Sequence, residues 1–151
     1  MTIKVRQFEL SDEQEVIALW RESGLTVPWN DPHEDIQRKL SVQADLFLVG
    51  VDGTRIVAAM MVGYDGHRGS IFYLAVAPDL QGKGLGRRMV EEAEERLKAL
   101  GCPKLNLLVR SSNQSVIEFY KRLGFSVDDV VNLGKRLEKD ESTRGTLSEE
   151  T

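Results

Sequence analysis

The chain has 151 residues and a net charge of −4, with 41% hydrophobic and 29% charged residues. These values fit one globular domain around one hydrophobic core. The sequence has no run of eighteen apolar residues, no apolar signal core at the N-terminus and only one cysteine, Cys102. A membrane span, a secretion signal and an internal disulfide are therefore not expected, and we predict a cytoplasmic protein.

The negative charge is concentrated at the C-terminus. Residues 138–151 contribute −3 of the total of −4, which leaves the rest of the chain close to neutral. A near-neutral body offers no broad basic surface for nucleic acid. We expect one domain over residues 1–138 and a polar, disordered tail over residues 139–151.

The N-terminal part predicts one strand followed by two helices. Ile3–Phe8 is the strand, and Ser11–Gln14 has the pattern of a capping box that begins the first helix. Gly24 ends that helix. Asp31 caps the second helix, and Pro32 suits its first position.

Three consecutive strands are predicted next, over Leu46–Val51, Ile56–Tyr64 and Ser70–Val76. Asp52-Gly53 is a two-residue turn signal, so the first two of these strands should form a hairpin. Pro78 ends the third strand because proline cannot donate a hydrogen bond to a sheet ladder.

The C-terminal part alternates helix and strand. Its predicted elements are a helix over Gly84–Leu100, a strand over Leu105–Val109, a helix from Asn113 or Ser115 to Leu123, and short strands over Phe125–Val127 and Val130–Leu137. The long helix has one apolar stripe, made by Leu85, Met89, Ala93, Leu97 and Leu100. The order β-α-α-β-β-β-α-β-α-β-β predicts an α/β layered domain whose mixed central sheet has helices on both faces.

A glycine-rich turn stands between a predicted strand and the long helix. Gly82, Gly84 and Gly86 alternate with other residues there, and Lys83, Arg87 and Arg88 add positive charge. The unpaired amides of a helix N-terminus attract anions, and glycines let the backbone approach a diphosphate closely.

Two other glycine-rich motifs do not match this turn. The dinucleotide fingerprint needs its third glycine one residue later than Gly86, and a P-loop needs Ser or Thr where Gly84 follows Lys83. A flexible loop without a ligand is the alternative that the turn alone leaves open.

Two motifs together resemble the GNAT family of N-acetyltransferases. Leu74–Arg87, with its Val76-Ala77-Pro78 strand end and glycine turn, is similar to the family's cofactor motif. The second motif comprises Asn113, Tyr120 and Gly124-Phe125. The resemblance spans residue 3 to about residue 137 and implies a mostly antiparallel sheet of the GNAT fold, with acetyl-CoA as co-substrate and an amine as acceptor.

The resemblance also implies roles for individual residues. The strand would pair with the pantetheine arm at a bulge, where it diverges from the Leu105–Val109 strand, and a strand amide would stabilise the oxyanion. Tyr120 would be the general acid for the leaving thiol. The residues expected to bind the cofactor are Leu74, Ala75, Val76, Gln81, Gly82, Lys83, Gly84, Leu85, Gly86, Arg87 and Asn113.

The general base is missing from its expected place. Relatives that acetylate protein N-termini carry a glutamate in a Leu-Glu-Val-Arg strand, where this chain has Leu108. His67 is a candidate base because its unperturbed pKa is near neutrality, although an exposed loop histidine without a role is the alternative. Asp31, Tyr73 acting through water, and a water chain without a single base are also open.

Further expectations concern the acceptor pocket, the assembly, other partners and catalytic turnover. Trp29 and Asn30 either line the acceptor pocket or cover the core. Val130–Leu137 could pair across a homodimer, and no metal, nucleic acid or membrane is expected as a partner. The alternative to an enzyme is an acetyl-CoA-binding regulatory or interaction module that has lost turnover.

Overall fold

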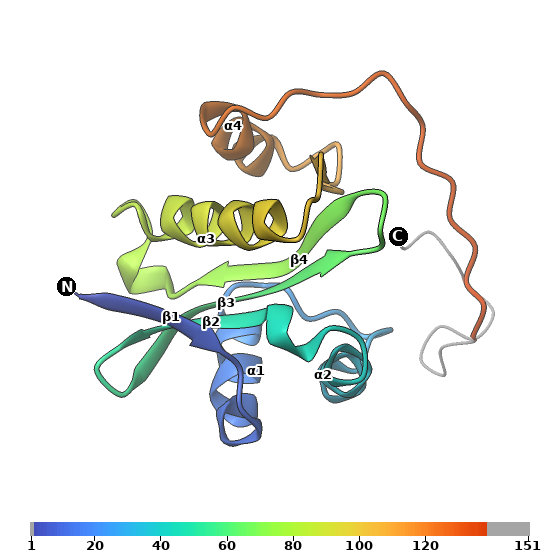
Figure 1. The fold of residues 1–151 in the computed structure, drawn as a ribbon. Coiled ribbons are helices and arrows are strands. Elements are labelled where there is room, and N and C mark those ends of the chain that lie inside the picture. The colour runs from blue at the N-terminus through green and yellow to red at the C-terminus, as the bar shows by residue number, and fades with distance from the viewer. Residues whose placement is uncertain (1, 139–151) are drawn as a thin grey trace. The chain divides into compact units, whose positions relative to one another are not determined.

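The computed structural model describes residues 2–138, which form two compact units (Figure 1). The first unit comprises residues 2–27 and 31–107, and the second comprises residues 28–30 and 108–138. The predicted tail, 139–151, lies outside the described residues. Within residues 2–138, every helix is too short or too polar to cross a membrane.

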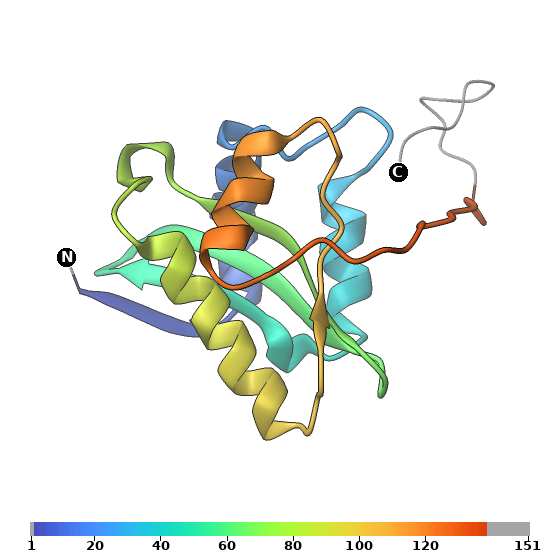
Figure 2. The same ribbon diagram turned by 90° about the horizontal axis from the view of Figure 1, so that it is seen from above.

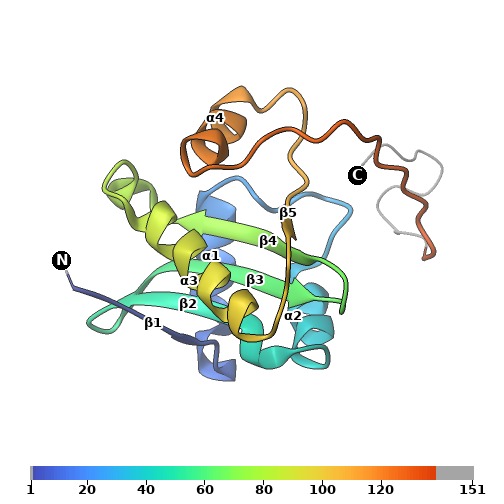
Figure 3. The ribbon, with the colours of Figure 1, turned by 45° about the horizontal axis from the view of Figure 1, so that its top comes forward.

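A five-stranded sheet is the centre of the first unit (Figure 3). Its strands are β1 (Ile3–Gln7), β2 (Phe47–Asp52), β3 (Arg55–Tyr64), β4 (Gly69–Val76) and β5 (Leu105–Asn106), and they are hydrogen-bonded in that order. The first three pairs are antiparallel and the β4–β5 pair is parallel. This confirms the predicted mixed, mostly antiparallel sheet.

Three helices cover the sheet of the first unit. α1 (Glu13–Glu22) and α2 (Pro32–Leu40) lie on one face, and α3 (Leu85–Ala99) lies on the other (Figure 1). Seen from above, α3 runs across the strands (Figure 2). The largest fully buried side chains include Trp20, Phe47, Met60 and Met89, so apolar packing fills both sides of the sheet. The prediction of helices on both faces is confirmed.

The start of α1 differs from the predicted capping box at Ser11. A short 3-10 turn (Leu10–Asp12) precedes the helix, and the Asp12 carboxylate accepts a 2.8 Å hydrogen bond from the Glu9 amide. Arg6 donates two further bonds to that carboxylate, at 2.8 and 3.0 Å. Burial acts to raise the pKa of Asp12, but these hydrogen bonds outweigh burial and lower it. The capping box is therefore formed by Glu9 and Asp12 instead of Ser11 and Gln14.

Two other local predictions have different outcomes. The Asp31 side chain accepts a 2.9 Å hydrogen bond from the amide of His33, which confirms it as the cap of α2. The apolar stripe of α3 is buried at Leu85, Met89, Ala93 and Leu97, but Leu100 is 49% exposed. Leu100 follows the last helical residue, so it no longer points with the stripe.

The C-terminal strands are the main error of the prediction. In the second unit, α4 (Gln114–Arg122) forms as expected, but Phe125–Val127 and Val130–Leu137 are irregular. The apolar alternation of these segments is typical of strands, yet a strand also requires a backbone partner. Within residues 2–138 neither segment joins a sheet.

Candidate functional site

A bulge interrupts the pairing of β4 with β3. Ala59 lies opposite Ala75 and Met61 lies opposite Phe72, so Tyr73 and Leu74 together face the single residue Met60. Tyr73 has a φ of +58°, which is rare for a residue other than glycine. Such a conformation costs on the order of 1–3 kcal/mol and persists only where neighbouring groups hold it, often at functional sites.

The other edge of β4 is open beside this bulge. β5 pairs with β4 only at Gly69–Leu105 and Ser70–Asn106, instead of along the predicted Leu105–Val109 strand. In the first unit no strand pairs with this edge of β4 beyond Ser70. Its main-chain groups are therefore available to an extended ligand, as in strand addition. The bulge and the divergence of the two strands are the features that the family resemblance implies.

The chain passes from β4 through a short turn into the N-terminus of α3. Gly82 and Gly84 have φ values of +80° and +85°, which favour glycine. Gly84 is the N-cap of α3, and the first backbone bond of the helix runs from the Arg88 amide to the Gly84 carbonyl. The amides before Arg88 therefore have no intrahelical acceptor in the first turn, as at any helix N-terminus.

This helix N-terminus fits a diphosphate. A Cβ atom added at Gly82 or at Gly84 would meet no atom within 4 Å, so the space in front of the turn is open. The first turn of α3 has no acidic residue, and Lys83, Arg87 and Arg88 lie in or next to it and add positive charge. Main-chain amides, the helix dipole and these cations would act in the same direction on bound phosphates.

The predicted cofactor residues of the first motif lie at the end of β4 (Leu74, Ala75 and Val76) and in the turn and first residues of α3 (Gln81 to Arg87). One of them has an additional contact, since the Gln81 side-chain amide donates a 3.2 Å hydrogen bond to the Val76 carbonyl. The exposed Arg87 guanidinium lies 3.9 Å from the Glu91 carboxylate. Both contacts are exposed, so a ligand could displace them at low cost.

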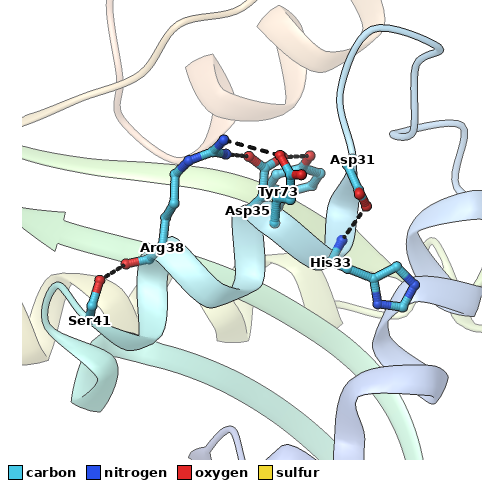
Figure 4. Close-up of polar contacts among 7 residues, drawn as sticks. Asp31, His33, Asp35, Arg38, Ser41 and Tyr73 are labelled. Atoms are coloured by element: carbon cyan, nitrogen blue, oxygen red, sulfur yellow. Dashed lines mark hydrogen bonds and ion pairs between the residues drawn. The ribbon is translucent and has the colours of Figure 1, made fainter. Parts of the chain in front are cut away.

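Tyr73 is held by two contacts on the face of the sheet that α1 and α2 cover. Its ring stacks on the fully buried Trp20, with ring centroids 4.0 Å apart. Its hydroxyl donates a 2.5 Å hydrogen bond to the Asp35 carboxylate (Figure 4). Burial and this hydrogen bond raise the pKa of the Tyr73 phenol, so its hydroxyl remains protonated at neutral pH.

The partner of Tyr73, Asp35, is not among the residues predicted from the sequence. Arg38, one turn later on α2, donates a 3.0 Å bond to Oδ1 of Asp35, while Tyr73 bonds Oδ2 (Figure 4). The Asp35 side chain remains 24% exposed. The only signal in the sequence is its helical spacing from Asp31, which places two carboxylates on one side of α2.

His67 lies at the opposite end of β4 from the glycine turn. It is exposed in the β3–β4 turn, where its amide donates a 2.7 Å bond to the Asp65 side chain. The nearby Gly69 packs against Leu97 and Cys102, near the C-terminal end of α3. Because α3 is about 22 Å long, this placement weighs against His67 as the base.

The second motif lies in the second unit. Asn113 is the N-cap of α4, and its side-chain oxygen accepts a 3.4 Å bond from Ser115. The Tyr120 ring packs edge-on against Phe119 and Phe125. Burial raises the pKa of Tyr120 to about 12, so the phenol carries its proton at neutral pH, as a general acid must.

Trp29, Leu108 and Cys102 also stand out in the sequence, and the structure gives their surroundings. Trp29, of the second unit, is partly exposed, and Leu108 is 67% exposed. The Cys102 thiol donates a 3.3 Å bond to the Lys104 carbonyl. None of these contacts assigns a catalytic role.

Comparison with known sequences finds one family model and several relatives that cover most of the chain. A model of the acetyltransferase (GNAT) family matches residues 13–125. The chain is 47% identical over 139 residues to an acetyltransferase of Yersinia enterocolitica, covering 92% of this chain and 99% of that protein. It is 46% identical over 138 residues to an acetyltransferase of Pectobacterium atrosepticum, covering 91% and 98%.

Solved structures share the fold. The PaiA N-acetyltransferase of Thermoplasma acidophilum, crystallised in complex with coenzyme A, superposes with a TM-score of 0.69 at 21% identity. The match covers 87% of this chain and 94% of that one. At this identity the likeness concerns the fold alone.

Proposed function

This chain belongs to the acetyltransferase (GNAT) family, and from that premise we propose that it transfers the acetyl group of acetyl-CoA to a primary amine by direct attack in a ternary complex. The observation that carries the proposal is the open, positively charged N-terminus of α3, which is the next helix after the open edge of β4. The acceptor is a small-molecule amine or an amine of a peptide or protein.

Binding of the co-substrate would use both parts of this arrangement. The amides from Gly82 to Arg87 would hold the pyrophosphate, and main-chain groups of β4 from Leu74 to Val76 would pair with the pantetheine arm. To form that pair at Val76, the arm would replace the Gln81 side chain on the Val76 carbonyl. Asn113 would contact the pantetheine, which is proposed on the family resemblance alone.

The chemistry needs three contributions from the protein. The amine nitrogen forms a bond to the thioester carbon, and the carbon–sulfur bond breaks. A main-chain amide at the β4 bulge would stabilise the negative charge that develops on the carbonyl oxygen, a contribution of about 3 kcal/mol for one such donor. Tyr120 would give its phenolic proton to the leaving sulfur, again by family resemblance. The third contribution is removal of a proton from the amine.

The proposed cellular setting rests on the cysteine content, and the proposed assembly rests on exposed apolar side chains. A cytoplasmic location fits the single cysteine. We expect a homodimer because Val131, Leu133 and Leu137 are 83%, 90% and 94% exposed in a segment with strand-like alternation. Large exposed apolar side chains of this kind commonly mark an interface.

A matched pair of glycine variants tests the phosphate cradle. Gly84 and Gly101 flank the two ends of α3, both have a φ of +85°, and a Cβ at either would meet nothing within 4 Å. Gly84→Asp and Gly101→Asp therefore impose the same backbone cost. Only Gly84→Asp places a carboxylate in front of the proposed cradle, so coenzyme A should bind it at least about tenfold more weakly.

Isothermal calorimetry with coenzyme A measures this difference. Equal affinities for Gly84→Asp and the wild type would contradict the cradle, and equal losses in both variants would indicate a general backbone effect. Thiol release from acetyl-CoA, measured with polyamines, amino acids and peptide N-termini, then tests turnover. Tight binding of coenzyme A without turnover on any amine would favour the regulatory alternative.

A further inference from the structure

We propose that Asp35 is the terminal proton acceptor for the acceptor amine and that the hydroxyl of Tyr73 relays the proton to it. This inference rests on the proposed acetyl transfer and supplies the base that its chemistry requires. The two side chains meet only in the folded protein, because Tyr73 belongs to β4 and Asp35 belongs to α2. Both residues lie in the first unit.

The position of Tyr73 places the relay beside the reacting group. Tyr73 is a bulged residue of β4, so its side chain leaves the sheet where an amide would polarise the acetyl carbonyl. The stack on Trp20 fixes the ring on the α1–α2 face, opposite the face that α3 covers. An amine that attacked the acetyl carbon from this face would meet the Tyr73 hydroxyl.

The hydrogen bond defines the direction of proton transfer. Tyr73 donates its only hydroxyl proton to Oδ2 of Asp35, so the lone pairs of the phenol oxygen can accept a proton from an ammonium group. As the N–H bond breaks, a new O–H bond forms at Tyr73, and the original phenol proton moves to Asp35. The amine becomes neutral, Asp35 becomes a carboxylic acid, and Tyr73 is unchanged.

Arg38 positions the carboxylate for this transfer. Its guanidinium holds Oδ1 of Asp35 with a 3.0 Å hydrogen bond. Oδ2 therefore remains directed at Tyr73 (Figure 4). The 3.3 Å contact of Arg38 with Glu34 is an exposed ion pair and contributes little to this placement. The partial exposure of Asp35 gives the proton a route to solvent after each turnover.

The surrounding charges are consistent with a relay. The charged groups that act on Tyr73 are Asp35, Arg38 and Asp31, all contributed by α2 and its cap, whereas α1 presents the uncharged ring of Trp20. The raised pKa of the phenol keeps Tyr73 from acting as a base by itself. Asp35 is the carboxylate that can accept the proton from Tyr73 and pass it to solvent.

The test compares Asp35→Asn and Tyr73→Phe with Glu34→Gln as the matched control. Glu34→Gln removes one charge from the same helix and contacts the same arginine, but Glu34 does not contact Tyr73. The two relay variants should lose a factor on the order of 10²–10⁴ in kcat/KM for the amine, as expected when proton transfer is removed. The control should stay within about threefold of the wild type, and coenzyme A affinity should be unchanged in all three variants.

Dependence on the amine separates a proton relay from a structural role. An α-amine of a short peptide has a pKa of about 8 and a lysine ε-amine one of about 10.4. Near pH 7.5 more of the α-amine is already neutral, so the ratio of wild-type to variant rates should be smaller for the peptide Ser-Gly-Gly than for Nα-acetyl-lysine methylamide. For both acceptors the ratio should fall as pH rises. A ratio that is independent of pH and of the amine would overturn the relay.

A titration of the tyrosines and the binding of coenzyme A can both be measured without turnover. In an absorbance titration of the tyrosines at alkaline pH, Asp35→Asn should lower the midpoint of the Tyr73 component, because the carboxylate that favours the neutral phenol is gone. The same titration of Tyr73→Phe should lack this component. If instead the wild type binds no coenzyme A, the proposed function fails; if it turns over normally and Asp35→Asn does too, only the relay fails.

Discussion

Tyr73 and Tyr120 are both phenols with raised pKa values, but their surroundings suit them to different tasks. Tyr73 is hydrogen-bonded to a carboxylate, which can remove a proton that passes through it. Tyr120 is packed against Phe119 and Phe125, and burial alone raises its pKa. An apolar setting favours a neutral hydroxyl that gives its proton only when a strong negative charge, such as a thiolate, develops beside it.

We predict that Tyr120→Phe lowers kcat by a factor on the order of 10² while the KM for acetyl-CoA changes little. The ring and its aromatic contacts remain, so the variant should fold. Because the pKa of Tyr120 is raised to about 12, the proton stays bound at and below pH 10, and this group should cause no alkaline decline of the wild-type kcat in that range. Steady-state kinetics across pH checks both points, and an unaltered kcat would remove Tyr120 from the mechanism.

Prediction from sequence succeeds for a residue whose partner is close in the chain and fails for one whose partner is distant. Asp31 could be identified as a cap because its partner, the amide of His33, is two residues away. The Tyr73–Asp35 pair could not be identified, since 38 residues separate its members and the bond depends on how α2 packs on β4. The φ of +58° at Tyr73 was equally hidden, because nothing in a tyrosine indicates a left-handed conformation.

Turn-forming residues in the sequence predicted the ends of the strands well. The Asp52-Gly53 signal gave the β2–β3 hairpin, and Pro78 gave the end of β4. The length of β5 was overestimated because apolar residues over 105–109 indicate a strand but not how far it can pair. The divergence from β4 that shortens β5 is the same feature that leaves the proposed ligand-binding edge open.

Gly69 illustrates a packing constraint where β4, β5 and α3 meet. An added Cβ would lie 2.8 Å from Cδ1 of Leu97 and 3.0 Å from Sγ of Cys102. We predict that Gly69→Ala destabilises the protein by about 1–3 kcal/mol, as overpacking of a tight site does. At Gly63, on the adjoining strand, the nearest atom would be 3.4 Å away, an ordinary contact.

Urea denaturation of the two variants measures this difference. Gly63→Ala is the control and should change the free energy of unfolding much less than Gly69→Ala does. Equal stabilities of the two variants would mean that Leu97 and Cys102 can move aside, so the junction is less tightly packed than the distances indicate.

In the chain beyond α4, the alternation of apolar residues predicts a strand but does not identify the strand's partner. Side chains alternate along an extended segment, so Val131, Leu133 and Leu137 would share one face of a strand. These residues are exposed, and within residues 2–138 their segment belongs to no sheet. An unpaired apolar strand is a template for pairing with another chain, and a second copy is the partner always present at equal concentration.

We therefore predict that Leu133→Asp converts a homodimer into a monomer. Light scattering after gel filtration should give about twice the chain mass of 17.0 kDa for the wild type and a single chain mass for the variant. Leu10→Asp is the matched control, because Leu10 is 70% exposed but lies in the short turn before α1. It should remain dimeric, since it adds the same charge outside the segment. A wild type that is monomeric at every concentration would show that Val130–Leu137 does not hold two copies together.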